Sequence, residues 1–129
     1  VLSGGEPTLR MDIIRLANAY FPILNIATNG LIKIPPEIRH TILISLDGQE
    51  ATHDRIRGKG TFAKVLANYQ GDPRVIYRMT IHKQNLDEVD AVAQIAQQNQ
   101  VRGISFIIHA PYQGSDALCL RTSKRGFWP

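Results

Sequence analysis

The sequence has little cysteine and no long apolar run. Its 129 residues include a single cysteine, Cys119, so the chain can form no internal disulfide and cannot hold a metal cluster by thiolates alone. We therefore expect a reducing, cytoplasmic compartment. No apolar stretch approaches the roughly 20 residues of a membrane-spanning helix, and no stretch has the charged and then apolar pattern of a signal peptide.

Motifs of several common enzyme classes are absent as well. The chain contains no Ser-His-Asp order, no zinc-ligand spacing and no phosphate-loop signature. Its formal net charge of +4 is small, and lysines and arginines do not gather into a stripe, so nucleic acid is not an expected partner. At 43% hydrophobic residues, the composition is that of an ordinary soluble domain.

The chain instead alternates between two hydrophobic periods. Short apolar runs bounded by turn residues predict strands, and apolar residues at helical spacing predict helices between them. A polar loop is expected from the end of the third strand to Gly60. The expected strands cover 1–3, 23–27, 41–46, 75–81 and 104–108, and the expected helices cover 9–20, 35–37, 62–69 and 86–96, the last with Asn85 as its N-cap.

This alternation predicts an α/β fold with parallel strands and right-handed crossovers. A doubly wound sheet and a barrel are both open on this evidence, and both bind ligands at the C-terminal ends of their strands. Polar residues follow the predicted strands at those ends. His82 and His109 end two neighbouring strands, and each is more simply a polar rim residue than a catalytic one.

The first polar strand end is Ser3-Gly4-Gly5-Glu6-Pro7. Two glycines let a backbone approach a ligand closely and leave carbonyls free to accept hydrogen bonds. A carboxylate beside them favours an amine. The simpler interpretation is a turn into a helix that begins near Pro7, with Glu6 at the positive end of the helix dipole.

A second polar segment runs from Ile44 to Phe62. Ser45 and Asp47 alternate at a strand end, so their side chains are expected to point the same way. Arg57 follows ten residues after Asp47, and its planar guanidinium suits a carboxylate. The simpler interpretation is an exposed charged loop of weak ion pairs, in which His53 has an ordering role.

Taken together, "SGGEP", "TNG" and "SLDG" followed by "HDRIRG" resemble the radical S-adenosylmethionine (SAM) superfamily, in the branch of the anaerobic sulfatase-maturating and peptide-modifying enzymes. The resemblance runs through nearly the whole chain. It implies a partial (β/α)6 TIM-like barrel of parallel strands whose first strand-helix unit is missing. Residues 1–129 would then be a core domain that is incomplete at the N-terminus and at the C-terminus.

The resemblance also implies the residues that bind SAM. Gly4, Gly5 and Glu6 would hold the methionine amine, and Arg57 would grip the SAM carboxylate. Asp47 is expected near substrate or in a polar network. The remaining SAM contacts would be Ser45 at the methionine moiety or ribose, Asn29 as an assisting residue in the same cavity, and Ile81 with His82 beside the adenine.

One defining element of that superfamily is absent, namely the Cys-x3-Cys-x2-Cys loop that ligates a [4Fe–4S] cluster. Three thiolates hold three irons of such a cluster, and Cys119 cannot replace them. We expect the ligands upstream of Val1, so this chain alone would be inactive. The alternatives are a cluster-free module that binds SAM or another nucleotide, and a degenerate paralogue that kept the barrel.

For the parent enzyme, the resemblance implies reductive cleavage of SAM by the cluster. The resulting 5′-deoxyadenosyl radical would abstract hydrogen from a substrate that the sequence does not reveal. The implied partners are SAM, that substrate, and an electron donor such as flavodoxin or ferredoxin. The protein itself would position the reactants and exclude water.

Overall fold

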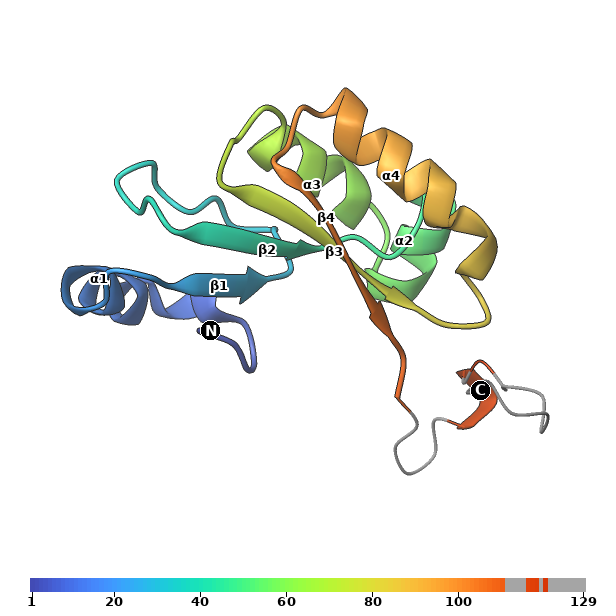
Figure 1. Ribbon diagram of the computed structural model, residues 1–129, viewed down its shortest axis with the longest axis horizontal. Coiled ribbons are helices and arrows are strands. Elements are labelled where there is room, and N and C mark those ends of the chain that lie inside the picture. The colour runs from blue at the N-terminus through green and yellow to red at the C-terminus, as the bar shows by residue number, and fades with distance from the viewer. Residues whose placement is uncertain (111–115, 119, 121–129) are drawn as a thin grey trace, which may run out of the picture.

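The structure is a computed structural model that describes residues 1–110, 116–118 and 120. Four strands and four α-helices carry the fold (Figure 1). The strands are β1 (Asn25–Thr28), β2 (Thr41–Ser45), β3 (Val75–Ile81) and β4 (Gly103–Ile108); the helices are α1 (Met11–Tyr20), α2 (Glu50–Arg57), α3 (Thr61–Tyr69) and α4 (Val89–Gln98); and short 3-10 turns cover Pro7–Arg10, Leu86–Glu88 and Asp116–Leu118. No helix in the described ranges is long and apolar enough to cross a membrane.

All four strands are parallel and form one sheet in the order β1-β2-β3-β4. Leu2 extends this sheet by a parallel bridge to Ile26, so the predicted first strand is reduced to one bridge. The α/β prediction and its parallel strands are confirmed. The strands follow one another across the sheet in the same order as in the chain. Right-handed crossovers between such strands put all the connecting helices on one face of the sheet. In a doubly wound sheet the strand order reverses, so that helices cover both faces.

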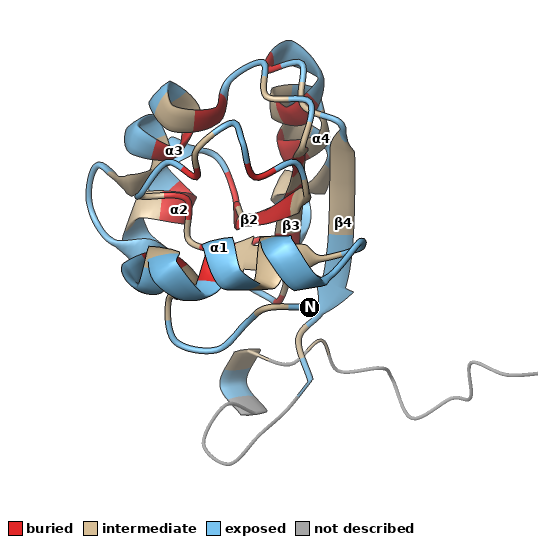
Figure 2. Cartoon of the chain, turned by 90° about the vertical axis from the view of Figure 1, so that its left-hand side faces the viewer, coloured by how far each residue is buried: buried red, intermediate tan, exposed pale blue. Residues whose placement is uncertain are grey.

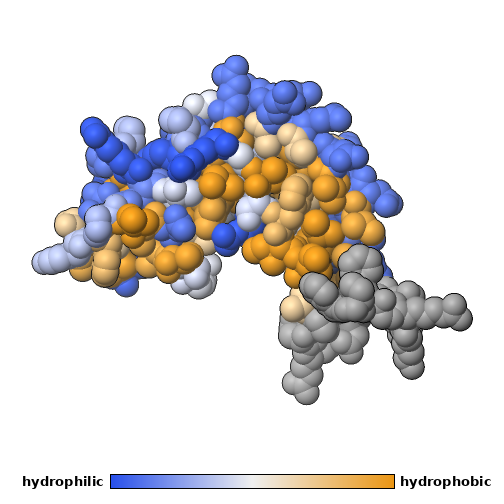
Figure 3. Space-filling model, in the orientation of Figure 1, coloured by the Kyte–Doolittle hydropathy of each residue, from blue (hydrophilic) through white to orange (hydrophobic). Residues whose placement is uncertain are grey.

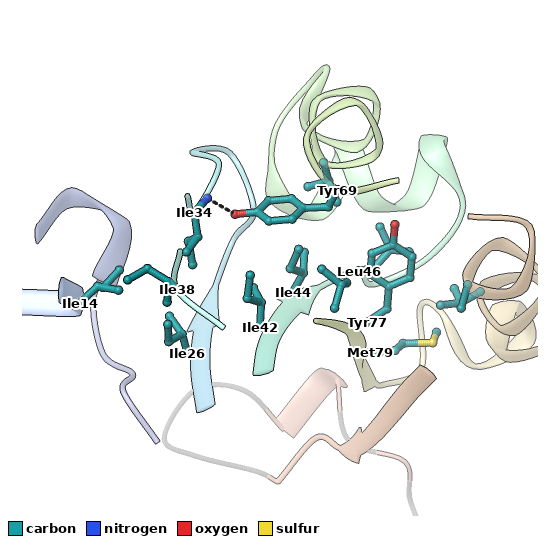
Figure 4. Packing of buried hydrophobic residues seen from close by; sticks show 14 residues of the cluster. Ile14, Ile26, Ile34, Ile38, Ile42, Ile44, Leu46, Tyr69, Tyr77 and Met79 are labelled. Atoms are coloured by element: carbon teal, nitrogen blue, oxygen red, sulfur yellow. Dashed lines mark hydrogen bonds between the residues drawn. The ribbon is translucent and has the colours of Figure 1, made fainter. Parts of the chain in front are cut away.

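The hydrophobic core lies between the sheet and its helices. Alternate strand residues such as Ile26, Ile42 and Tyr77 are fully buried against Ile14 of α1 and Tyr69 of α3 (Figure 4). Figure 2 shows the buried positions gathered along β2, β3 and the inward sides of the helices. The strands are near-continuous apolar runs, but only this face has helices packed on it.

The opposite sheet face, which we call the open face, carries the intervening residues. From the strand register, it includes Ala27, Leu43, Ser45, Ile76, Arg78, Thr80, Ser105 and Ile107. No described helix lies over it. At the β4 edge, Phe106, Ile107 and Ile108 are 42%, 42% and 68% exposed, and apolar side chains gather there beside the blue outer surface of the helices (Figure 3).

Helix α1 also has an uncovered apolar surface. The periodic residues of the predicted helix are mostly exposed, with Leu9 at 71%, Leu16 at 55% and Tyr20 at 75%, whereas Ile14 is fully buried. Leu2, Ile13, Leu16, Ala17, Tyr20 and Phe21 line an apolar cavity of about 550 Å³ on this side. The helical period was therefore predicted correctly, but nothing in the described ranges covers that face.

Two local predictions were wrong. The expected polar loop from 49 to 60 contains helix α2 over Glu50–Arg57. Its buried positions are Thr52 and His53, so a search for apolar periodicity could not find it. The short helix expected at 35–37 is a single turn, closed by a 3.1 Å hydrogen bond from the Ile38 amide to the Pro35 carbonyl.

Arg74 fixes the chain that leads into β2. Its guanidinium donates to the carbonyls of Ile34, Pro35 and Ile38 at 3.1, 2.8 and 2.6 Å. Asp72 accepts from the same guanidinium at 2.6 Å, and both side chains are nearly buried. The 29–40 connection has no helix or strand, and the Arg74 side chain supplies hydrogen bonds to three of its carbonyls.

We predict that Arg74→Met lowers the free energy of unfolding by about 3 kcal/mol or more, because it leaves three carbonyls without their donor and the Asp72 carboxylate without its ion-pair partner. Arg10→Met is the matched control, since the Arg10–Asp12 pair is more than 60% exposed and such pairs contribute little. Urea denaturation of both variants measures the difference. Equal stabilities would contradict the role given to Arg74.

Candidate functional site

A cavity of about 300 Å³ opens where the strands end on the open face. It brings together the turn that follows Leu2 with residues of β1, β2, β3 and helix α2, or directly after them. Its lining is Gly4, Gly5, Glu6, Ala27, Thr28, Asn29, Leu43, Ser45, Arg57 and Arg78. Six of the eight residues predicted to bind SAM therefore meet in one cavity, as expected for the C-terminal ends of parallel strands.

Gly4 and Gly5 form the turn at one side of this cavity. Both have positive φ angles, 99° and 52°, which favour glycine. A Cβ atom added at either position would meet no other atom within 4 Å. The backbone is therefore open to the cavity, and a ligand can approach it closely.

The Glu6 carboxylate accepts hydrogen bonds from two segments of the chain. Its Oε1 accepts hydrogen bonds from the Thr8 amide at 3.1 Å and from the Thr8 and Thr28 hydroxyls at 2.6 Å. Its Oε2 accepts from the Asn29 amide at 2.8 Å. The carboxylate caps the turn that begins at Pro7, as the sequence predicted, and it ties that turn to the end of β1.

The charge on Glu6 is stabilised by these contacts. Burial by itself raises the pKa of Glu6, but the hydrogen bonds from Thr28, Thr8 and Asn29 outweigh it and hold the pKa below 4.5. The carboxylate is thus ionised at neutral pH and occupied by protein donors. The atoms at this turn that remain available to an amine are the backbone carbonyls.

Arg57, predicted to grip a carboxylate, is paired with Asp47. Its Nε donates to Asp47 Oδ2 at 2.5 Å, and the Asp47 side chain is 3% exposed against 32% for Arg57. The two terminal guanidinium nitrogens make no hydrogen bond to a residue in the described ranges. Asp47 thus orients the arginine, and its outer edge lies on the cavity.

Asp47 is the centre of a buried polar network, one of the two places expected for it. Its Oδ1 accepts from the Thr80 amide at 3.0 Å, and its own amide donates to His53 Nδ1 at 3.2 Å. The Asn85 amide group donates to the Asp47 carbonyl at 2.9 Å. Burial lowers the pKa of His53, so this histidine is neutral and acts as an acceptor that orders the segment.

Asn85 precedes the 3-10 turn at Leu86–Glu88, but its side chain does not cap a helix. It accepts from the His82 amide at 2.8 Å and donates to the Thr80 carbonyl at 2.9 Å as well as to Asp47. Asn85 therefore lies at the predicted N-cap position, but the prediction that its side chain caps the helix was wrong. The amide links the end of β3 to the loop after β2.

Ile81 and His82 do not line the cavity. They lie at the end of β3, where His82 is 6% exposed. Its ring centroid is 6.4 Å from that of His109, in an edge-to-face arrangement. The two histidines are neighbours, as the strand order implied, but they face each other rather than the Gly4-Gly5 turn.

Arg78 is a charged cavity residue that was not predicted from the sequence. It stands in β3 opposite Ser45 of β2 and Ser105 of β4. Its Nε is buried and has no hydrogen-bond partner in the described structure. The available signal was a charged residue in the middle of the apolar strand "VIYRMTI", which marks a side chain that points away from the core.

No group of three or more His, Cys, Asp or Glu side chains among the described residues could hold a metal ion. Cys119 lies outside the described residues. The described residues therefore do not fit an iron–sulfur cluster.

No family model matches the chain, but curated proteins do. Fe-coproporphyrin III synthase of Methanosarcina barkeri is 34% identical over 88% of this chain and 32% of its own length. The sporulation killing factor maturation protein SkfB of Bacillus subtilis is 34% identical over 74% of this chain and 27% of its own. The AdoMet-dependent heme synthase of Methanosarcina barkeri is 30% identical, over 76% and 33%. The chain thus spans about a third of the length of these relatives.

We predict that Glu6→Gln lowers the free energy of unfolding at neutral pH by about 1–3 kcal/mol, because an amide nitrogen then faces donors. Since the folded-state pKa lies below 4.5, the stabilisation by Glu6 is present above that pH and is lost as the pH falls through the folded-state value. Urea denaturation at successive pH steps should therefore show the two proteins converging in acid.

The exposed Glu37 supplies the control, since its contact with Arg15 is long, at 3.7 Å, and more than half exposed. Glu37→Gln should match the parent at every pH. A constant gap between parent and Glu6→Gln down to the acid limit would show that the ionised carboxylate is not what holds the turn.

Proposed function

The chain belongs to the radical SAM superfamily, and on that premise we propose that it is the part of a larger enzyme that binds SAM. The observation that carries this proposal is the single cavity that joins the Gly4-Gly5 turn, Ser45 and Arg57. These residues come from three separate segments. The parallel sheet places the Gly4-Gly5 turn beside the end of β2, and Arg57 reaches the cavity from the end of helix α2.

In this proposal the sheet is part of a (β/α)6 barrel. Further strand-helix units of the barrel would pack on three surfaces: the apolar face of α1, the sheet edge at Leu2 and the sheet edge at β4. The one-sided placement of the helices supports a barrel, because its interior would be the open face. Residues 1–129 would then be one section of the barrel domain.

The residues of the cavity have separate tasks toward SAM. The carbonyls of the Gly4-Gly5 turn would accept from the methionine ammonium, while Glu6 holds that turn in place. Arg57, oriented by Asp47, would donate its terminal nitrogens to the methionine carboxylate. The Ser45 hydroxyl would donate to the methionine moiety or the ribose, and Asn29 would assist from the neighbouring strand end.

Enzymes of this superfamily use SAM with a [4Fe–4S] cluster as a source of the 5′-deoxyadenosyl radical. Because this chain has one cysteine, the cluster ligands would come from residues outside it, and these 129 residues alone would not carry out the reaction. An electron donor of the flavodoxin or ferredoxin type would reduce the whole enzyme. The chain's own contribution is to bind and orient SAM and to exclude water.

We predict that the whole protein, purified anaerobically, binds SAM and releases 5′-deoxyadenosine in the presence of a strong reductant. Chromatographic detection of 5′-deoxyadenosine measures the cleavage. Binding without cleavage in a protein free of iron would instead support the cluster-free module or the degenerate paralogue. A protein that binds no SAM would contradict the proposed function.

We predict that Ser45→Ala weakens SAM binding about three- to tenfold, the effect of losing one neutral hydrogen bond. Thr41→Ala is the matched control, because Thr41 lies on the same strand and the same face at the opposite end of β2. Isothermal titration calorimetry of the two variants gives the comparison. Equal dissociation constants for both would remove Ser45 from the binding site.

A further inference from the structure

Arg78 lies at the centre of the open face, within the proposed SAM cavity. The strand register puts it between Ser45 of β2 and Ser105 of β4, so two hydroxyl-bearing residues flank it on the same face. It shares the cavity lining with the Gly4-Gly5 turn. A charged side chain therefore borders the cavity in which SAM is proposed to bind.

The guanidinium of Arg78 is unpaired within the described structure. Its Nε has no accessible surface and no hydrogen-bond partner, and no carboxylate in the described ranges forms an ion pair with it. A partly buried cation without a partner costs free energy. Such a cost is offset when a ligand supplies the missing acceptor.

The acids near the cavity cannot supply it, because each is already engaged. Glu6 accepts from Thr8, Thr28 and Asn29. Asp47 accepts from Arg57 and from the Thr80 amide. The Arg78 guanidinium is thus left without a carboxylate partner among the described side chains.

We propose that Arg78 binds a carboxylate that enters this cavity, an inference that rests on the proposed function of the same site. The planar fork of an unpaired guanidinium matches the two oxygens of a carboxylate. The carboxylate belongs either to SAM itself or to a second molecule bound beside it.

The test uses the whole protein, purified anaerobically, and two variants, Arg78→Gln and Arg78→Lys. Arg39→Gln is the matched control, since it removes the same charge at an exposed position outside the cavity. Circular dichroism and thermal unfolding first verify that each protein is folded. Calorimetry then measures binding of SAM and of decarboxylated SAM, which lacks only the carboxylate.

If the carboxylate is that of SAM, Arg78→Gln weakens SAM binding at least about tenfold, as expected for a charge-assisted bond. The affinity of Arg78→Gln for decarboxylated SAM stays that of the parent. The affinity of Arg78→Lys for SAM lies between those of the parent and Arg78→Gln, and Arg39→Gln binds SAM as the parent does. Equal weakening of SAM and decarboxylated SAM by Arg78→Gln would show a merely structural role and overturn the proposal.

If the carboxylate comes from a second molecule, Arg78→Gln leaves the affinity for SAM unchanged. Propionate then serves as the probe, at constant ionic strength with chloride as reference, and it raises the thermal midpoint of the parent but not of Arg78→Gln. Unchanged SAM affinity together with no Arg78-dependent effect of propionate would overturn the proposal.

The propionate titration is run both with and without SAM. A parent protein that binds no SAM contradicts the proposed function, while the titration without SAM still decides the role of Arg78. The failure of one proposal is thereby distinguished from the failure of the other.

Discussion

The geometry of the cavity depends on the hydrogen bonds that the Glu6 carboxylate accepts. They join the turn before α1 to the end of β1, two segments more than twenty residues apart in the chain. The Leu2 bridge also attaches the turn with Gly4 and Gly5 to the sheet. A carboxylate that seemed suited to a ligand amine is thus occupied in holding the backbone that such an amine would meet.

The same arrangement recurs at the end of β2. Asp47 is buried and accepts from Arg57 and from the Thr80 amide, and Arg57 lines the cavity. With both acids engaged, the groups available to a ligand are backbone carbonyls on one side and arginines on the other. Such a cavity is complementary to the ammonium and the carboxylate of an amino acid, which is the part of SAM that the superfamily's glycine-rich strand end is expected to hold.

Much of this arrangement could be predicted from the sequence, because buried parallel strands are apolar runs that end in polar turns. The bounds of β3 were predicted without error, and the strand-end rule predicted that Gly4 and Ser45 lie together. Arg57, at the end of helix α2, was assigned from the family resemblance and not from this rule. Helix α2 was missed because its buried face is polar. Arg78 was missed because strand alternation says which face a residue occupies only after the sheet order is known. The hydrogen bonds of Glu6 are tertiary contacts, which no local pattern predicts.

The most direct test of the proposed site is the structure of the whole protein, crystallised anaerobically with SAM. We predict that the methionine moiety lies on the open face, with its ammonium at the carbonyls of the Gly4-Gly5 turn and Glu6 still bonded to Thr28 and Asn29. Glu6 turned to the ammonium, or SAM bound away from the ends of β1 and β2, would contradict it.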